Sequence, residues 1–255
     1  MIAFLHQVLE QNTKSALDKN QILCYNNKEK TKGEAAMKIK AVIFDMDGII
    51  LDTETLLAKY WCRAANEFGF PMEYKHALEL RSLAGEYASP LLKKYFGEDF
   101  DYNTVRNRRK QLMELDIEQN GLKKKKGIDT ALDHIERLGL HKAVATATDM
   151  ERAAKYLKTV GLMDKFDTVC CGPMVEHGKP APDIYLFAAE KLGLDPQECV
   201  AVEDSPNGIT SAYRAGMKPI MIPDLSQPDE ELKKLLYRKC DSLEELPRVL
   251  EELII

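Results

Sequence analysis

Near the start of the chain, two acidic residues separated by one position follow a short apolar run. Residues 40–54 read KAVIFDMDGIILDTE, so Asp45 and Asp47 come directly after residues 41–44 and just before Gly48. Two carboxylates this close resist ionising together unless a cation offsets their repulsion. Carboxylate oxygens suit Mg²⁺, which binds one or two of them and completes its octahedron with water and phosphate oxygens. The pair therefore predicts a Mg²⁺ site that keeps Asp45 ionised and able to act as a nucleophile.

The spacing of the two acids also predicts a division of roles at a bound phosphoryl group. Because both residues follow the same strand, Asp45 can attack phosphorus while Asp47 protonates the leaving alkoxide. Once deprotonated, Asp47 can activate water against the resulting aspartyl-phosphate. Gly48 would let the backbone turn sharply and bring amide N–H groups close to the phosphoryl oxygens.

The elements that must position these residues alternate between strand and helix. Apolar runs typical of parallel strands covered on both faces occur at 39–45, 141–148, 166–172, 199–204 and 218–223. Helical patterns with capping residues lie between them at 149–161, 181–193 and 205–216. This alternation predicts an α/β fold with a doubly wound parallel sheet, that is, a Rossmann-like core.

One block interrupts this alternation with helical patterns and no convincing strand. We therefore expect an α-helical cap domain inserted between the first strand and the rest of the sheet. Four consecutive lysines at its exit, residues 123–126, predict a solvated linker. The expected organisation is a loosely ordered or docked N-terminal extension at 1–36, a core at 37–52 and 127–255, and a helical cap at 53–126.

Ligands of an open parallel sheet bind beyond the carboxyl ends of its strands. The chain places acids, a hydroxyl and a lysine at this edge: Asp45, Asp47, Thr146, Glu203, Asp204 and Lys179. Several acids in one place are stable only if a cation holds them, and Lys179 together with Mg²⁺ would do so.

Four segments in this order, DMDGIILDTE, VATATD, GKPAPD and VEDSPNGI, resemble the motifs of the haloacid dehalogenase-like (HAD) superfamily. The resemblance covers roughly residues 38–250, and the helical block is similar to the cap of the β-phosphoglucomutase-like branch. It implies that Asp45 is the nucleophile and Asp47 the general acid/base. It also implies that Thr146 and the adjacent Ala147 bind the phosphoryl group and that Lys179 neutralises it.

The same resemblance implies how Mg²⁺ is held. Asp45, the Asp47 carbonyl and Asp204 would be its ligands, with Glu203 either a further ligand or an orienting neighbour. Arg81, which lies beside the loop at Gly85, is a further candidate for substrate contact.

These features predict a Mg²⁺-dependent phosphatase of small phosphorylated metabolites, sugar phosphates above all. One alternative is a β-phosphoglucomutase, which would return the phosphoryl group to the sugar. The mutases resembled here carry a histidine where this chain has Leu57 and an arginine where it has Gly85, and both departures favour the phosphatase. The second alternative is a non-catalytic protein that binds a phosphometabolite or docks a partner through residues 1–36. The intact pair of Asp45 and Asp47 argues against it.

The predicted cap also contains a basic stretch, which has two possible interpretations, and two aromatic residues. Arg106, Arg108, Arg109 and Lys110 are expected to form a solvated helix face, with a clamp for a second anionic group of the substrate as the alternative. Trp61 and Phe68 are expected to pack in the interior of the cap.

Composition restricts partners and location. The chain of 255 residues has 41 acidic and 36 basic side chains, and the net charge of −5 argues against nucleic acid or a membrane as its main partner. No apolar run approaches the roughly 20 residues of a membrane-spanning helix. Six scattered cysteines without a CxxC pair predict reduced thiols. We therefore expect a cytoplasmic enzyme that is a monomer or a weak homo-oligomer.

Overall fold

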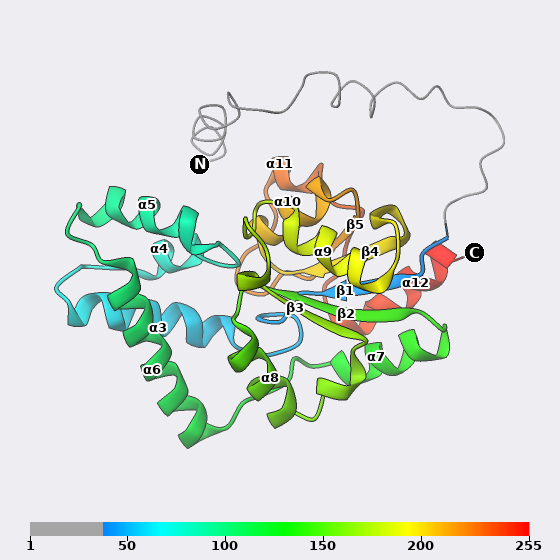
Figure 1. Ribbon diagram of the computed structural model, residues 1–255, viewed down its shortest axis with the longest axis horizontal. Coiled ribbons are helices and arrows are strands. Elements are labelled where there is room, and N and C mark those ends of the chain that lie inside the picture. The colour runs from blue at the N-terminus through cyan, green and yellow to red at the C-terminus, as the bar shows by residue number, and fades with distance from the viewer. Residues whose placement is uncertain (1–37, 255) are drawn as a thin grey trace. The chain divides into compact units, whose positions relative to one another are not determined.

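The computed structural model describes residues 38–254, and the predicted N-terminal extension lies outside them. Six parallel strands form one sheet in the order β3-β2-β1-β4-β5-β6 (Figure 1). The strands are β1 (Ala41–Phe44), β2 (His141–Thr146), β3 (Thr168–Cys171), β4 (Cys199–Glu203), β5 (Lys218–Met221) and β6 (Arg238–Lys239). The predicted doubly wound fold is confirmed, and the first five strands lie inside the predicted runs. The two-residue β6 was not predicted because it is too short and too polar to produce an apolar run.

Helices cover both faces of this sheet and account for its continuous apolar runs. The core helices are α7 (Ile128–Arg137), α8 (Met150–Thr159), α9 (Asp183–Leu192), α10 (Pro206–Arg214), α11 (Glu230–Lys233) and α12 (Leu246–Ile254). On β1, Val42 and Phe44 face the apolar cluster that includes residues of α7, α8 and α12, while Ala41 and Ile43 face residues of α9 and α10. Short 3₁₀ turns occupy Met163–Lys165, Gly172–Met174, Pro196–Glu198 and Leu243–Glu245.

The register of the sheet brings the polar residues after β1, β2 and β4 to one edge. Phe44 pairs with Val144 on β2 and with Val202 on β4, so these three strands end almost level. The next residues along each strand are therefore neighbours in space, as expected at the carboxyl ends of parallel strands.

Four helices stand between β1 and α7 and lie beside the carboxyl ends of the strands (Figure 1). We call residues 54–120 the helical insertion; it contains α3 (Glu54–Glu67), α4 (Tyr74–Leu78), α5 (Gly85–Phe96) and α6 (Tyr102–Asn120). Trp61 is buried and its ring lies 5.7 Å from that of Tyr102, between α3 and α6. The expectation for Phe68 was wrong, because α3 ends just before it and its side chain is 46% exposed. That the insertion moves as a cap domain remains a prediction.

The chain enters and leaves the helical insertion along two hydrogen-bonded segments. The Asp52 amide donates to the Lys123 carbonyl at 3.0 Å, and the Lys125 amide donates to the Ile50 carbonyl at 2.9 Å. Lys125 also pairs with Asp52 at 3.3 Å and with Asp224 at 2.9 Å. Lys123, Lys124 and Lys126 are exposed, as expected of a solvated linker, while Lys125 and these backbone hydrogen bonds attach the linker to the core. Within residues 38–254, none of the helices has the length and apolar character required to cross a bilayer.

Candidate functional site

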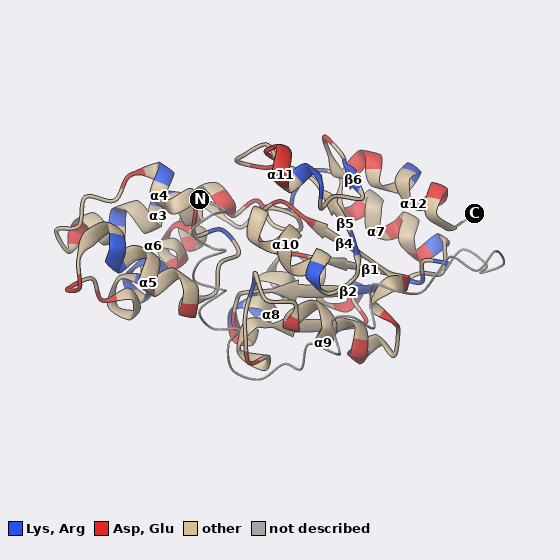
Figure 2. Cartoon of the chain, turned by 90° about the horizontal axis from the view of Figure 1, so that it is seen from above, with Lys and Arg blue, Asp and Glu red and all other residues tan. Residues whose placement is uncertain are grey.

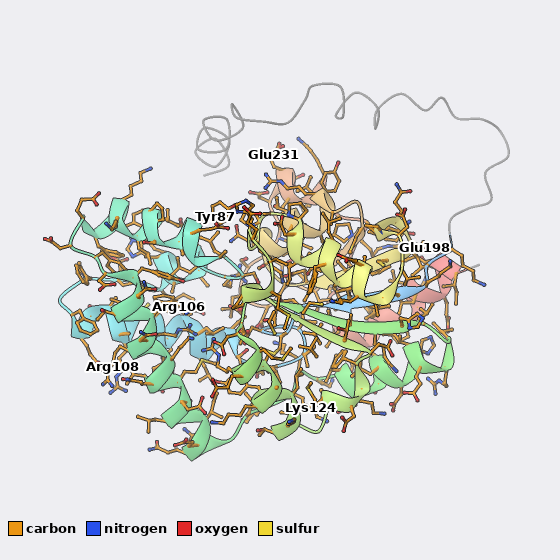
Figure 3. All side chains as sticks on the ribbon, in the orientation of Figure 1. Tyr87, Arg106, Arg108, Lys124, Glu198 and Glu231 are labelled. Atoms are coloured by element: carbon orange, nitrogen blue, oxygen red, sulfur yellow. The ribbon has the colours of Figure 1, made fainter. Side chains whose placement is uncertain are left out.

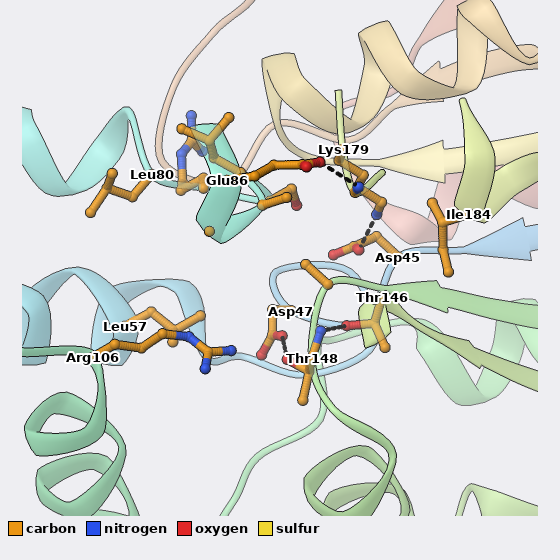
Figure 4. A pocket seen from close by; sticks show the side chains of 18 of the residues that line it. Asp45, Asp47, Leu57, Leu80, Glu86, Arg106, Thr146, Thr148, Lys179 and Ile184 are labelled. Carbon is orange, nitrogen blue, oxygen red and sulfur yellow. Dashed lines mark hydrogen bonds and ion pairs between the residues drawn. The ribbon is translucent and has the colours of Figure 1, made fainter. Parts of the chain in front are cut away.

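A cavity of about 420 Å³ lies between the carboxyl ends of the strands and the helical insertion (Figure 4). The core contributes Asp45, Asp47, Thr146, Ala147 and Lys179 to its lining, so these five predicted site residues share one cavity. The volume falls near the lower limit of small-molecule sites, which is about 300 Å³. The cavity therefore suits a small metabolite.

Lys179 connects the nucleophile candidate to the end of β4. Its Nζ donates to Asp45 Oδ1 at 2.5 Å, to Glu203 Oε1 at 2.6 Å and to the Ala145 carbonyl at 2.9 Å. These three bonds use all the protons of the ammonium group. Although burial opposes its charge, the adjacent Asp45 and Glu203 carboxylates raise the pKa of Lys179 above its ordinary value. Lys179 is therefore a fixed cation that holds Asp45 in position.

Asp45 follows β1 directly and is almost completely buried. Burial above all, with the Glu203 and Asp47 charges adding to it and Lys179 opposing it, raises the pKa of the Asp45 carboxyl to about 8. Its second oxygen, Oδ2, is buried and accepts no hydrogen bond from any described residue. One oxygen is thus held by Lys179 while the other remains available.

Asp45, Glu203 and Asp204 offer ligand atoms that all lie within 4.8 Å of one another. Both carboxylate oxygens of Asp204 are buried and, like Asp45 Oδ2, accept no hydrogen bond within the described residues. Buried carboxylate oxygens without partners are costly unless a cation or protons compensate them. Oxygen ligands in this arrangement fit a hard divalent cation such as Mg²⁺.

Glu203 differs from the other two acids because its oxygens already have partners. Oε1 accepts from Lys179 and from the Tyr185 hydroxyl at 2.7 Å, and Oε2 accepts from the Ser205 hydroxyl at 3.3 Å. A Cβ on Gly208 would lie 1.9 Å from Oε1, so the glycine of the SPNGI segment makes room for this carboxylate. These bonds favour an orienting role for Glu203 over direct metal ligation.

The loop after β1 must also approach the acid cluster closely. Gly48 has a φ of +86°, and a Cβ there would lie 2.7 Å from Asp204 Oδ2 and 2.8 Å from the Glu54 side chain. Any other residue would combine an unfavourable backbone conformation with a steric clash. Gly48 therefore lets the loop after β1 pack directly against the Asp204 and Glu54 side chains.

Two threonines orient Asp47, and the sequence reasoning missed both of these roles. Thr53 Oγ1 donates to Asp47 Oδ1 at 2.5 Å. Thr148 Oγ1 donates to Asp47 Oδ2 at 3.1 Å (Figure 4). The Thr148 amide in turn donates to the Thr146 hydroxyl at 3.1 Å. The repeat of threonine two positions after Thr146 was the available signal for Thr148. Thr53 carried no comparable signal.

Arg81 extends from the helical insertion to the acid cluster. Its Nη1 lies 3.5 Å from Asp204 Oδ2, its Nη2 donates to the Ser226 hydroxyl, and its Nε donates to the Leu78 carbonyl at 3.3 Å. Arg81 also lines the cavity, which is consistent with the predicted contact with substrate. That contact remains a prediction. In this structure the charge of Arg81 is directed to Asp204.

Glu54 is a further buried acid that the sequence reasoning did not select. It begins α3, lines the cavity, and its Oε2 has no hydrogen-bond partner within the described residues. Burial raises its pKa well above the ordinary value, and the nearby Asp204 and Asp47 carboxylates add to the shift. Its position at the end of the DMDGIILDTE segment was the signal for it.

Figure 2 colours the Lys and Arg residues of the described chain blue. The basic stretch of α6 is divided between two environments, which corrects the expectation of a uniformly solvated face. Arg106 and Arg109 line the cavity, and Arg109 is only 5% exposed. Arg108 instead pairs with Glu67 at 2.5 Å on the outer surface of the insertion. The strongly polar composition of α6 concealed its buried side, because no apolar stripe marks it.

Comparison with known proteins agrees with the resemblance in the four motifs. The profile of the haloacid dehalogenase-like hydrolases matches residues 42–222. The phosphorylated carbohydrates phosphatase of Thermotoga maritima is 30% identical over 187 residues, which are 71% of this chain and 84% of the relative. Hexitol phosphatase A of Escherichia coli K12 is 30% identical over 207 residues, which are 78% of this chain and 93% of the relative.

Solved structures share the same architecture. The crystal structure of β-phosphoglucomutase from Clostridium difficile superposes with a TM-score of 0.72 at 23% identity, covering 84% of this chain and 97% of that one. At this identity the likeness shows the fold alone, and it includes the helical insertion as well as the sheet.

Proposed function

Because the chain belongs to the haloacid dehalogenase-like hydrolase family, we propose that it is a Mg²⁺-dependent phosphatase of small phosphorylated metabolites. The reaction would pass through an aspartyl-phosphate at Asp45. The observation that carries this proposal is the position of Asp45, held through Oδ1 by Lys179 while Oδ2 faces the cavity region without a hydrogen bond. A non-catalytic binding protein would have no need of such a nucleophile.

The similar proteins support carbohydrate phosphates as the substrate class. The Thermotoga maritima relative is named for phosphorylated carbohydrates and the Escherichia coli relative for hexitols. The cavity of about 420 Å³ accommodates a molecule of that size. We therefore propose that sugar or sugar-alcohol phosphates are the substrates.

In the first step, Asp45 Oδ2 forms a bond to phosphorus while the bond between phosphorus and the ester oxygen breaks. The leaving alkoxide takes a proton from Asp47, whose two oxygens are oriented by Thr53 and Thr148. Lys179 keeps Asp45 in line and neutralises charge on the phosphoryl group. The step yields the free alcohol and an aspartyl-phosphate.

In the second step, the deprotonated Asp47 accepts a proton from a water molecule that attacks phosphorus. The bond between Asp45 Oδ2 and phosphorus breaks, which releases phosphate and restores the carboxylate. Thr146 and Ala147 line the cavity next to this region and would bind the phosphoryl oxygens through the hydroxyl and the backbone.

Mg²⁺ would be held by the carboxylates of Asp45 and Asp204 and by the Asp47 carbonyl. When bound, it would neutralise negative charge on the transferring phosphoryl group. Glu203 would orient Lys179, since the hydrogen bonds of Lys179, Tyr185 and Ser205 engage its oxygens. Asp204 Oδ1 supports this assignment, because it is buried and has neither a hydrogen bond nor an ion pair within the described residues.

The helical insertion would open to admit substrate and close to exclude bulk water. Polar contacts join it to the core in the structure. The Ala84 amide donates to the Lys179 carbonyl at 3.0 Å, and the Asn207 side chain donates to the Arg81 carbonyl at 2.9 Å. Opening would break these contacts.

A panel of phosphorylated metabolites, assayed for phosphate release with Mg²⁺ and again with EDTA, tests the proposal. We expect release from sugar phosphates with Mg²⁺ and loss of release with EDTA. Absence of release from the whole panel would contradict the phosphatase. A separate reaction with β-glucose 1-phosphate and a trace of the bisphosphate tests the mutase, which would form glucose 6-phosphate faster than free phosphate.

A further inference from the structure

Arg109 is a buried cation that the proposed reaction does not use. It projects from α6, is 5% exposed, lines the cavity, and lies 5.2 Å from the centre of the Trp61 ring. Its Nε has no hydrogen-bond partner within residues 38–254, and Nη1 makes only a long contact of 4.0 Å with the Met113 sulfur. No carboxylate of the described chain pairs with it. Burying a guanidinium this way is unfavourable unless a ligand completes the site.

Two further arginines line the same cavity. Arg106 precedes Arg109 by one turn of α6, and Arg152 comes from α8. Burial and, after it, the neighbouring charges of Arg152 and Arg106 together lower the pKa of Arg109 to about 10, so both arginines repel the Arg109 guanidinium. We call Arg106, Arg109 and Arg152 the arginine cluster.

The acids nearby do not neutralise this cluster. Asp149 lies 3.6 Å from Arg152, but it is shared with Lys110, whose Nζ is 3.0 Å away. Arg106 has no ion pair or hydrogen bond to any described residue. Asp47 acts on Arg109 electrostatically without forming an ion pair with it. Arg106 and Arg109 on the insertion side, with Arg152 of α8, therefore keep positive charge in this part of the cavity.

The cluster and the phosphoryl site belong to one cavity. In Figure 4, Arg106 extends from one side toward Asp47, with Asp45 and Lys179 on the other side. A single small molecule in this volume of about 420 Å³ can therefore contact both sides.

We propose that the arginine cluster binds a second anionic group of the substrate. The preferred substrates are then phosphate monoesters that carry a carboxylate or another phosphate at the end opposite to the reacting group. This inference rests on the proposed phosphatase and narrows its substrate class. Guanidinium groups suit both anions because their planar donors match carboxylate and phosphate oxygens in pairs.

Three six-carbon substrates test the inference with the full chain and Mg²⁺. Glucose 6-phosphate has no second anionic group, 6-phosphogluconate has a carboxylate at the opposite end, and glucose 1,6-bisphosphate has a phosphate there. We expect kcat/KM for at least one of the two compounds with a second anionic group to exceed that for glucose 6-phosphate by about tenfold or more. The gain should appear in KM, since a hydrogen bond to a charged group contributes enough for about a tenfold change in affinity. The comparison between those two compounds identifies the anion.

The variants Arg109→Gln and Arg106→Gln should each reduce that preference by about tenfold. Arg108→Gln is the matched control, because Arg108 lies on the opposite side of α6 from Arg106 (Figure 3) and pairs with Glu67 outside the cavity. It should retain the preference of the unmodified chain. If Arg109→Gln fails to fold, Arg106→Gln decides the question, because Arg106 is only partly buried and no described residue is its partner.

Binding measured by calorimetry separates this inference from the proposed function. In the Asp45→Asn variant the ligand is not consumed, so affinities for the three compounds can be compared with and without Arg106→Gln. Equal affinities and equal kcat/KM values for all three compounds would overturn the inference and leave the phosphatase intact. Arginine-dependent binding without hydrolysis by the unmodified chain would support the cluster and contradict the phosphatase.

Discussion

The two sides of the cavity differ in whether their buried cation has a carboxylate partner. On the core side, Lys179 is completely buried but donates to two carboxylates and a carbonyl. On the insertion side, Arg109 is almost as deeply buried but has no carboxylate partner within the described chain. The core side is therefore already assembled for a reaction at one phosphoryl group. The insertion side is incomplete without the rest of a substrate.

The difference also has a structural origin. The core residues follow neighbouring parallel strands whose register brings their ends level, so the sheet fixes their positions. The insertion residues project from α6, which is attached to the core through polar contacts and the crossing at residues 123–126. We therefore expect the candidate catalytic residues to be held more rigidly than the residues of the insertion side.

The largest expected effect is on the core side. Asp45→Asn should reduce kcat for phosphate release by about 10³-fold or more, because an amide cannot attack phosphorus and form the intermediate. Steady-state assays measure the loss, and circular dichroism checks that the fold is retained. A variant with activity within tenfold of the unmodified chain would contradict the role of Asp45.

Asp47→Asn should lower kcat by about 10²–10⁴-fold, the usual contribution of a general acid/base. The loss in kcat/KM, which reports on the steps up to release of the alcohol and not on the later attack by water, should be smaller for p-nitrophenyl phosphate than for a sugar phosphate, because a nitrophenolate leaves without protonation. Equal losses for both substrates would show that Asp47 does not protonate the leaving group.

A pair of methionine variants compares the two sides directly through stability. Lys179→Met should lower the free energy of unfolding by about 3–5 kcal/mol, because it leaves Asp45 and Glu203 buried without their cation. Arg109→Met should change it much less, since no ion pair is lost and an apolar side chain replaces a buried charge. Urea unfolding measures both values, and equal losses would remove the distinction between the two sides.

The smallest effect concerns the attachment of the insertion. Lys110→Met removes the 3.0 Å pair between α6 and Asp149, and both side chains are 30% exposed. Solvent and salt screen such pairs, so the expected loss of stability is about 0.2–1 kcal/mol and should decrease further in high salt. Lys59→Met is the control within the insertion, because its 3.9 Å pair with Asp116 does not reach the core. A larger loss for the control would contradict the attachment role.

The sequence by itself determined the sheet and the residues at its edge. Apolar runs marked the first five strands, and motif residues such as Asp45, Asp47 and Lys179 stand within a few positions of a strand end or a helix start. For such residues, the position relative to a strand end in the sequence is enough to predict that they lie in the site. The reason is that parallel strands bring their carboxyl ends to a common edge.

Only the tertiary structure decided which groups each side chain meets. The sequence left the role of Glu203 open, and its bonds to Lys179 and Tyr185 now favour orientation. Glu54 and Arg109 acquire their environments from segments distant in the chain, with Asp204 near Glu54 and Arg152 near Arg109. A polar helix such as α6 shows no apolar stripe, so the burial of one of its arginines depends on the cavity that the folded chain forms around it.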